Sequence, residues 1–240
     1  MRTYYYQLFT LSESAKIRDT IYSLRNNWIE RNSSFFTLGR AAYLDCPNDT
    51  YKNIDQLNNL LRKNFGLVYE KLFYFLKQIL GSSVDFSPIG QIPGFQIYLP
   101  SVIYSYSKHF PPHLDTQILY VLKNNNINLQ DFMSYTVSIE VPRKGAGLEY
   151  WEPIEPLPED VFKNLTTLTR IDYNDGPLKE YFIQVSLHTP KFIEYKNGNI
   201  FAHHGLYFHR PVIGTYGQKF PRITLQGHCV RRGDKFITFW

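Results

Sequence analysis

The chain has 240 residues, of which 43% are hydrophobic, 17% aromatic and 20% charged. A chain of this length can bury one ordinary core, and its apolar and aromatic content excludes a disordered protein. The net charge of +5 comes from 26 basic and 21 acidic residues scattered along the sequence, so nothing points to a nucleic-acid partner.

The two cysteines of the chain are Cys46 and Cys229. Two cysteines exclude a multi-bridge disulfide framework and a zinc site built from cysteines alone. The sequence has no run of eighteen apolar residues, and its first residues lack the apolar stretch of a signal peptide. We therefore expect a cytoplasmic protein without a membrane partner. No pattern indicates its oligomeric state.

The first ninety residues combine short strands with two helical patterns. A strand is expected at 4–11, followed by a helix over 12–31 that is capped by its first residue, a serine. A second strand is expected at 35–44. A longer helix is expected over 54–80, where apolar residues recur at helical spacing until a glycine ends it.

From residue 94 onward the apolar residues alternate, as they do in strands. Turns rich in proline and glycine separate these segments. Strands are expected at 95–99, 102–106, 113–122, 134–141, 181–187, 199–209, 221–230 and 235–240. The sequence therefore predicts a single α+β domain over 1–240. Residues of about 1–90 would form a helical support, and about 91–240 a core of jelly-roll or barrel form.

His113 and Asp115 are two residues apart in an expected strand, so their side chains share one face. An imidazole beside a carboxylate supplies two ligands of a metal site, although this pattern also occurs by chance. A third ligand has to come from a distant segment, and the candidates are His203, His204 and His209. Adjacent residues of a strand face opposite ways, so at most one of His203 and His204 could serve.

The segment that starts at Arg222 alternates polar and apolar side chains. Arg222, Thr224, Gln226 and His228 share one face. Either this is an ordinary strand with its polar face in water, or the polar face lines a cavity. In a cavity, the planar guanidinium of Arg222 and the hydroxyl of Thr224 are suited to bind a carboxylate. Two histidines and one carboxylate occupy one face of Fe(II) and leave three positions open.

Together these motifs resemble those of the 2-oxoglutarate/Fe(II)-dependent oxygenases of the double-stranded β-helix superfamily. The resemblance runs from HLDTQ at 113–117 to the C-terminal strands. It includes YTVSIEVPRKGAGLEYW at 135–151, which is similar to a strand and glycine turn beside the substrate in those enzymes. FFTLGRAAYLD and PGFQIYLP resemble N-terminal segments of a bacterial group of such oxygenases. The resemblance implies a jelly-roll core flanked by N-terminal helices.

The resemblance also implies roles for individual residues. His113, Asp115 and His209 match the catalytic ligands of Fe(II), and His204 is the alternative to His209. Arg222 and Thr224 match the residues that bind the far carboxylate of 2-oxoglutarate. Four more residues are expected near the metal carboxylate or the substrate: Gln117, Glu149, Tyr150 and Trp151. Three others are expected to line the cavity or simply to pack: Gln96, Tyr98 and His228.

The implied activity is that of a dioxygenase. It would use O2 and 2-oxoglutarate to hydroxylate an unactivated C–H bond of a small molecule or peptide, releasing succinate and CO2. Two alternatives stay open at this point. One is a cupin-like metal enzyme that uses the same ligands without 2-oxoglutarate. The other is a metal-free jelly roll that binds a sugar or a protein and has no catalytic activity.

Overall fold

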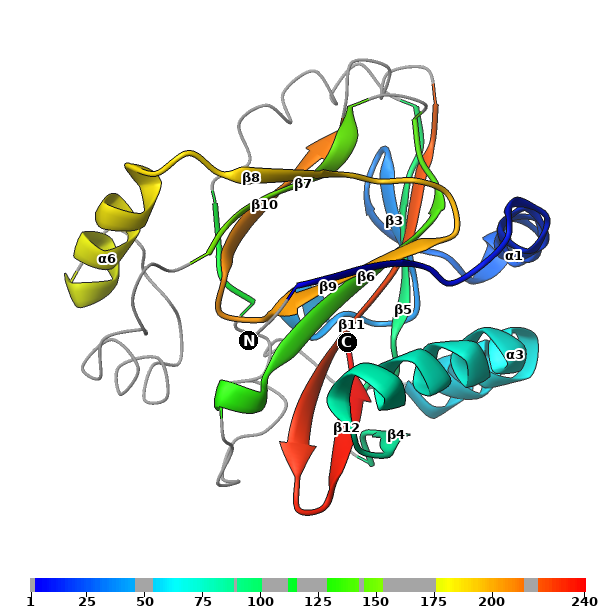
Figure 1. The fold of residues 1–240 in the computed structure, drawn as a ribbon. Helices are drawn as coiled ribbons and strands as arrows, with labels where there is room; N and C mark the ends of the chain where they lie inside the picture. Colours follow the sequence, from blue (N-terminus) through cyan, green and yellow to red (C-terminus); the bar gives the residue numbers. More distant parts are fainter. Residues whose placement is uncertain are drawn as a thin grey trace.

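The computed structural model describes residues 3–45, 54–88, 90–100, 112–115, 129–142, 145–152, 176–213 and 220–240. Its strands form two sheets in which every strand pair but one is antiparallel. Helices cover the outer face of the larger sheet, and the smaller sheet lies across from its inner face (Figure 1). The α+β class expected from the sequence is therefore confirmed.

The larger sheet has nine strands drawn from the whole length of the chain. Seven of its strands pair side by side in the order β1 (Tyr4–Gln7), β9 (Asn199–His204), β6 (Met133–Glu140), β11 (Arg222–Arg232), β5 (Gly94–Tyr98), β3 (Phe35–Leu38) and β2 (Ile29–Asn32). Two further strands continue from β11, namely β12 (Lys235–Phe239) and the parallel β4 (Val84–Phe86). N-terminal strands thus occupy both ends of the main strand order.

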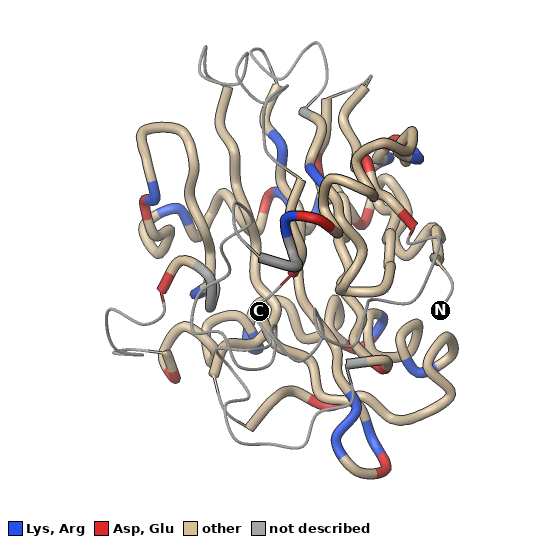
Figure 2. Tube along the Cα trace, turned by 90° about the vertical axis from the view of Figure 1, so that its left-hand side faces the viewer, with Lys and Arg blue, Asp and Glu red and all other residues tan. Residues whose placement is uncertain are grey.

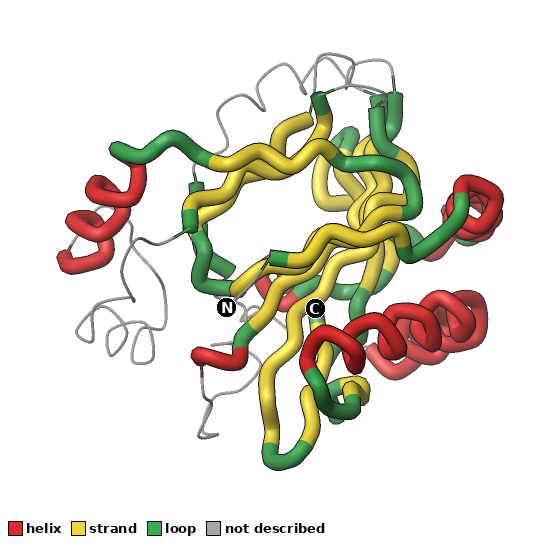
Figure 3. The backbone as a smooth tube through the Cα atoms, viewed as in Figure 1, coloured by secondary structure: helices red, strands yellow, loops and turns green. Residues whose placement is uncertain are grey.

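The smaller sheet has three strands in the order β10 (Phe208–Ile213), β7 (Ala146–Trp151) and β8 (Lys191–Glu194). A single antiparallel bridge joins His113 to His209 of β10. In Figure 3 the smaller sheet lies opposite β6 and β9 of the larger sheet.

Helices α1 (Leu11–Ser23) and α3 (Ile54–Leu80) lie on the outer face of the larger sheet (Figures 1 and 3). The apolar stripe of α3 packs into the same core as the sheet residues Phe95, Ile97 and Leu225. Gly81 follows α3 with a φ of +67°, a left-handed conformation that glycine adopts without strain. The predicted helix over 54–80 is confirmed with its bounds.

The helix expected over 12–31 is shorter than predicted. It begins after Thr10, whose hydroxyl accepts a hydrogen bond from the Glu13 backbone while the Glu13 carboxylate accepts one from the Thr10 backbone. This capping box, and not the expected serine, starts the helix. Beyond Ser23 the chain forms the short helix η1 (Arg25–Asn27) and then β2, because residues 29–32 pair with β3.

Four expected strands differ from the structure. The strand expected at 4–11 ends at Gln7, because the capping box at Thr10 starts α1. Residues 181–187 lie mostly in the helix α6 (Gly176–Ser186), so that strand prediction is wrong. The strand expected at 199–209 is two strands, β9 and β10, separated by a turn. The strand expected at 35–44 ends at Leu38, because Gly39 turns the chain with a φ of +106° ahead of the short helix α2 (Ala42–Asp45).

The remaining strand predictions are either confirmed or lie outside the described residues. The strands expected at 95–99, 134–141, 221–230 and 235–240 are confirmed as β5, β6, β11 and β12 to within two residues at each end. Strands β4, β7 and β8 were not expected, and a short helix η3 (Leu129–Asp131) precedes β6. The strand expected at 102–106 and most of that at 113–122 lie outside the described residues.

Charged residues of both signs lie at many separate places along the chain (Figure 2). Several of them form ion pairs with a nearby residue of opposite charge, for example Arg231 with Asp131 and Lys235 with Asp85. None of the helices that the structure describes is both long and apolar enough to cross a membrane.

Candidate metal centre

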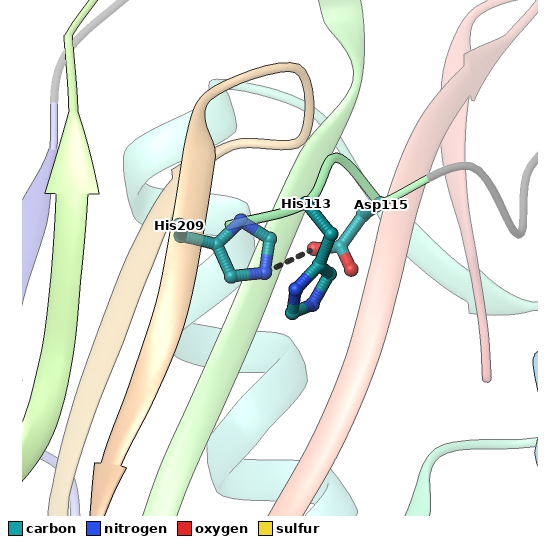
Figure 4. A group of neighbouring side chains, drawn as sticks. All are labelled: His113, Asp115 and His209. Atoms are coloured by element: carbon teal, nitrogen blue, oxygen red, sulfur yellow. Dashed lines mark ion pairs between the residues drawn. The ribbon is translucent and has the colours of Figure 1, made fainter. Parts of the chain in front are cut away.

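His113, Asp115 and His209 lie together, with their side chains pointing toward one another (Figure 4). One nitrogen of each histidine and one carboxylate oxygen of Asp115 all lie within 4.8 Å of one another. His209 Nε2 is 3.6 Å from Asp115 Oδ2, and the two imidazole centroids are 4.5 Å apart. The arrangement could hold a metal ion.

The backbone sets the positions of these three residues. The N–H of His113 donates to the carbonyl of His209 at 2.9 Å, and the N–H of His209 donates to the carbonyl of His113 at 3.0 Å. The N–H of Asp115 donates to the carbonyl of Gly205 at 3.2 Å. The segment that carries His113 and Asp115 is thus aligned with β10 by main-chain hydrogen bonds, whatever the side chains are.

The ring orientation of His209 is fixed by one more contact. Its Nδ1 lies 2.9 Å from the carbonyl oxygen of Tyr207. A carbonyl oxygen can only accept, so Nδ1 carries the proton and donates it. Nε2 is then the atom with a free lone pair, and it is the atom that faces Asp115. A histidine ligand is commonly oriented in this way by a partner on its other nitrogen.

Asp115 carries a negative charge in a buried place, with 7% of its surface exposed. Burial raises the pKa of this carboxyl group, but His209, His228, His113 and His203 together lower it by more. The net effect holds the pKa well below its usual range. Among the described residues, the two groups within ion-pair distance of its carboxylate are both histidines: His209 Nε2 at 3.6 Å and His228 Nδ1 at 3.9 Å. A buried carboxylate of this kind is stabilised by a cation, so the donor set fits a divalent metal.

Two further histidines border the site. His203 on β9 and His228 on β11 both pair in register with Ser134 on β6, so the three form one row across the larger sheet. Burial and the neighbouring His209 lower the pKa of His203 to about 3, and burial also lowers that of His228. Both rings are therefore neutral near pH 7 and do not cancel the charge of Asp115.

A cavity of about 210 Å³ opens from this site between the two sheets. The triad, His203, His228 and Ser134 line one part of it. Other polar and aromatic residues line the rest: Gln96, Tyr98, Thr136, Tyr195, Arg222 and Gln226. Arg222 is only 3% exposed, and its Nε has no hydrogen-bond partner among the described residues. The cavity thus has a carboxylate in one part of its wall and a buried cation in another.

Several predicted site residues lie elsewhere. His204 does not line the cavity, and its Nδ1 accepts a hydrogen bond from the Leu206 backbone at 3.1 Å. Thr224 is fully buried and does not line the cavity either, although its Oγ1 is 3.5 Å from Nε2 of the lining residue Gln226. Gln117 lies outside the described residues.

The three residues expected to contact the substrate are on β7, and none of them lines this cavity. Glu149 forms an ion pair with Arg210 at 2.5 Å. Trp151 donates from Nε1 to the carbonyl of His188 at 2.9 Å. Tyr150 is buried opposite His209 in the β7–β10 register. These contacts connect β7 to its neighbours, and a role toward the substrate stays a prediction.

Among the cavity residues that did not follow from the sequence as site residues are Ser134, Thr136 and Tyr195. The first two belong to the polar face of the alternating segment 134–141, a signal that was visible but had no assigned meaning. Tyr195 directly follows β8, a strand that was not expected, so no pattern placed it near the cavity.

No protein-family model matches the chain, and no curated protein is similar to it in sequence. Several solved structures share its fold, among them two enzymes of nogalamycin biosynthesis. The non-heme α-ketoglutarate-dependent epimerase SnoN from nogalamycin biosynthesis aligns with a TM-score of 0.53 and 10% identity, over 96% of this chain and 81% of SnoN. The carbocyclase SnoK from the same biosynthesis aligns with a TM-score of 0.52 and 10% identity, over 96% and 83%. The chain therefore shares its fold with these two α-ketoglutarate-dependent enzymes.

Proposed function

We propose that the protein is an Fe(II)- and 2-oxoglutarate-dependent dioxygenase. One observation carries the proposal: the His113–Asp115–His209 triad and the buried Arg222 line the same cavity of about 210 Å³. Two histidines and one carboxylate suit Fe(II) and leave positions open for other ligands. A guanidinium suits the two oxygens of a carboxylate. A cosubstrate with a chelating end and a distant carboxylate matches both requirements.

The triad residues would hold the metal, and the chain supplies their orientation. Hydrogen bonds along the backbone align His113 with His209, and the Tyr207 carbonyl leaves Nε2 of His209 available. When bound, Fe(II) with 2-oxoglutarate supplies O2-dependent oxidation, which hydroxylates an unactivated C–H bond and releases succinate and CO2. Burial of Asp115 and His209 keeps bulk water away from this reaction.

Arg222 would bind the far carboxylate of 2-oxoglutarate. Its Nε is buried without an acceptor among the described residues, and a buried N–H of this kind gains from one. Thr224, on the same face of β11, is the proposed hydroxyl partner. Thr224 is fully buried and does not itself line the cavity. It would therefore act together with Gln226, which lines the cavity and whose Nε2 is 3.5 Å from the Thr224 hydroxyl.

We also propose that the core is a double-stranded β-helix. From β5 onward the chain passes back and forth between the sheets: β5, β6, β9 and β11 belong to the larger sheet, while the His113 bridge, β7, β8 and β10 belong to the smaller one. This alternation of antiparallel strands between two facing sheets supports a jelly roll. It also explains how ligands from distant segments meet.

The substrate would be a small molecule or a peptide. The cavity of about 210 Å³ has room for the cosubstrate and for little beyond it. Only the reacting group of the substrate would then enter this space, and most of the substrate would bind outside it.

The proposal is tested by visible absorption of the protein under anaerobic conditions, with Fe(II) and then with 2-oxoglutarate. A weak charge-transfer band that needs both additions is the expected result, and it reports chelation of the metal by 2-oxoglutarate. Fe(II) binding without this band would favour the cupin-like enzyme. Absence of Fe(II) binding would favour a metal-free binding protein.

Two variants sharpen the test. His113→Ala should abolish Fe(II) binding, because it removes one of three ligands. Arg222→Ala should leave Fe(II) binding intact and weaken 2-oxoglutarate binding. An unchanged affinity for 2-oxoglutarate in Arg222→Ala would contradict the assignment of that residue.

A further inference from the structure

The guanidinium of Arg222 is enclosed by aromatic rings and not by carboxylates. Its Cζ lies 5.6 Å from the ring centroid of Tyr98 and 5.6 Å from that of Tyr195. Among the described residues, Arg222 forms no ion pair with an aspartate or glutamate. Two ring faces at this distance attract a cation without cancelling its charge.

The two rings come from different sheets. Tyr98 on β5 is the register partner of Arg222 on β11, and Phe35 on β3 is the register partner of Tyr98. The Phe35 and Tyr98 rings are stacked, with centroids 4.4 Å apart and an interplanar angle of 9°. Phe35, Tyr98 and Arg222 thus form one row across three strands of the larger sheet.

Tyr195 reaches the same guanidinium from the smaller sheet. It directly follows β8, and its backbone N–H donates to the carbonyl of Ala146 on β7 at 2.8 Å. Burial raises the pKa of Tyr195, against the lowering effect of the Arg222 charge. The phenol is therefore neutral near pH 7, and the positive charge of Arg222 stays uncompensated by it.

We propose that Tyr98 and Tyr195 are positioning residues for Arg222, which they hold between their ring faces so that its charge is directed at the far carboxylate of the cosubstrate. The proposal rests on the function proposed above. If the two tyrosines only filled space, their replacement would not change cosubstrate affinity specifically. In this proposal their rings raise that affinity by holding the guanidinium in place.

Tyr195 offers the cleaner test, since Tyr98 also stacks on Phe35. Tyr195→Phe keeps the ring face, and Tyr195→Leu removes it. A desolvated cation–π contact corresponds to a change of about 5- to 30-fold in affinity. We expect Tyr195→Leu to weaken 2-oxoglutarate binding to the Fe(II)-loaded protein by roughly this factor, and Tyr195→Phe to stay within about twofold of the parent. Fe(II) affinity should be unchanged in both variants.

A second probe separates positioning from general damage. The acid 2-oxopentanoate chelates a metal through the same end as 2-oxoglutarate but has no far carboxylate. Its affinity should not differ between the parent and Tyr195→Leu. Tyr69→Leu is the control for lost stability, because Tyr69 is a buried tyrosine that donates to the Pro93 carbonyl and does not line the cavity.

The possible results are distinct. Equal losses in Tyr195→Phe and Tyr195→Leu would show that the hydroxyl matters and would overturn the proposal, as would an unchanged 2-oxoglutarate affinity in Tyr195→Leu. An equal loss for 2-oxopentanoate would overturn it too. If Arg222→Ala weakens 2-oxoglutarate binding and Tyr195→Leu does not, this inference fails while the proposed function stands. If the parent protein does not bind 2-oxoglutarate, both fail.

Discussion

Asp115 places a negative charge in a buried position beside His203 and His228, whose pKa values are lowered by burial. Asp115→Asn keeps the shape of the side chain and removes the charge. We expect Fe(II) binding to be lost in an anaerobic titration. With chelator present, the free energy of unfolding in urea at pH 7 should fall, because the lowered pKa of Asp115 means that the ionised carboxylate stabilises the folded state. If the Asp115→Asn variant binds Fe(II) as tightly as the parent, the assignment of this ligand is wrong.

His209 and His204 offer a matched pair of substitutions. His209→Ala should abolish Fe(II) binding, since Nε2 of His209 is one of the three clustered donor atoms. His204→Ala should bind Fe(II) like the parent, since His204 does not line the cavity. Metal content after dialysis against Fe(II) under nitrogen measures both. The opposite pattern would make His204 the distal ligand.

Alternation along strands is what made the triad and Arg222 predictable from the sequence. It places His113 and Asp115 on one face, separates His203 from His204, and aligns Arg222 with the polar face of β11. The same rule could not tell that Thr224 would be fully buried, because depth within a face depends on neighbouring strands. The position of Tyr195 is set by β8, and a strand of only four residues is too short to be recognised from its sequence pattern.

At the scale of elements, α1 is joined to α3 through Glu13. Its carboxylate accepts from the Thr10 backbone and forms an ion pair with Lys71 at 2.5 Å. The Lys71 side chain, followed by the Thr10 backbone, lowers the pKa of Glu13 to about 2. The folded state therefore binds this proton less readily than the unfolded chain. The stabilisation is complete above the ordinary pKa of about 4.5 and is lost as the pH falls toward 2.

Glu13→Gln should accordingly be less stable than the parent at pH 7, with a difference that shrinks below pH of about 4.5. Urea unfolding at pH 7, 4 and 3 measures this difference. Glu70→Gln, an exposed glutamate on α3, serves as the control and should show little difference at any pH. A gap between Glu13→Gln and the parent that is constant with pH would contradict the role of the ionised carboxylate.

The wrong element predictions have identifiable causes. In the segment 181–187, Tyr181 and Ile183 lie in α6 and Leu187 directly follows it. Tyr181 is buried while Ile183 and Leu187 are exposed, so the apolar residues lie on more than one face and the period is ambiguous. Strand β7 contains Gly147, a residue that weakens a strand pattern. The structure gives the reason: a Cβ there would lie 2.1 Å from the Ile193 carbonyl oxygen of β8, so only glycine fits.

At the scale of the molecule, the N-terminal part is more than a helical support. Strand β1 pairs with β9 and β3 pairs with β5, while α1 and α3 contribute to the core that also contains sheet residues of the C-terminal part. We expect a fragment of residues 91–240 to show no cooperative unfolding transition by circular dichroism, because its larger sheet would lose strands and its outer face would be bare. A fragment that unfolds cooperatively and binds Fe(II) would contradict this.

The row from Phe35 to Arg222 has a consequence for building chimaeras. One end of the cavity depends on a ring carried by β3, far from the triad in the sequence. A C-terminal half grafted onto the N-terminal half of another protein of this fold would keep the three proposed metal ligands. It could still lose affinity for the proposed cosubstrate, because Tyr98 would lack its stacking partner. Successful recombination would require the donor half to bring an aromatic side chain at the position of Phe35. Whether two exchanged halves of this fold work together therefore depends on the side chains that meet in this row, and not only on where the halves are joined.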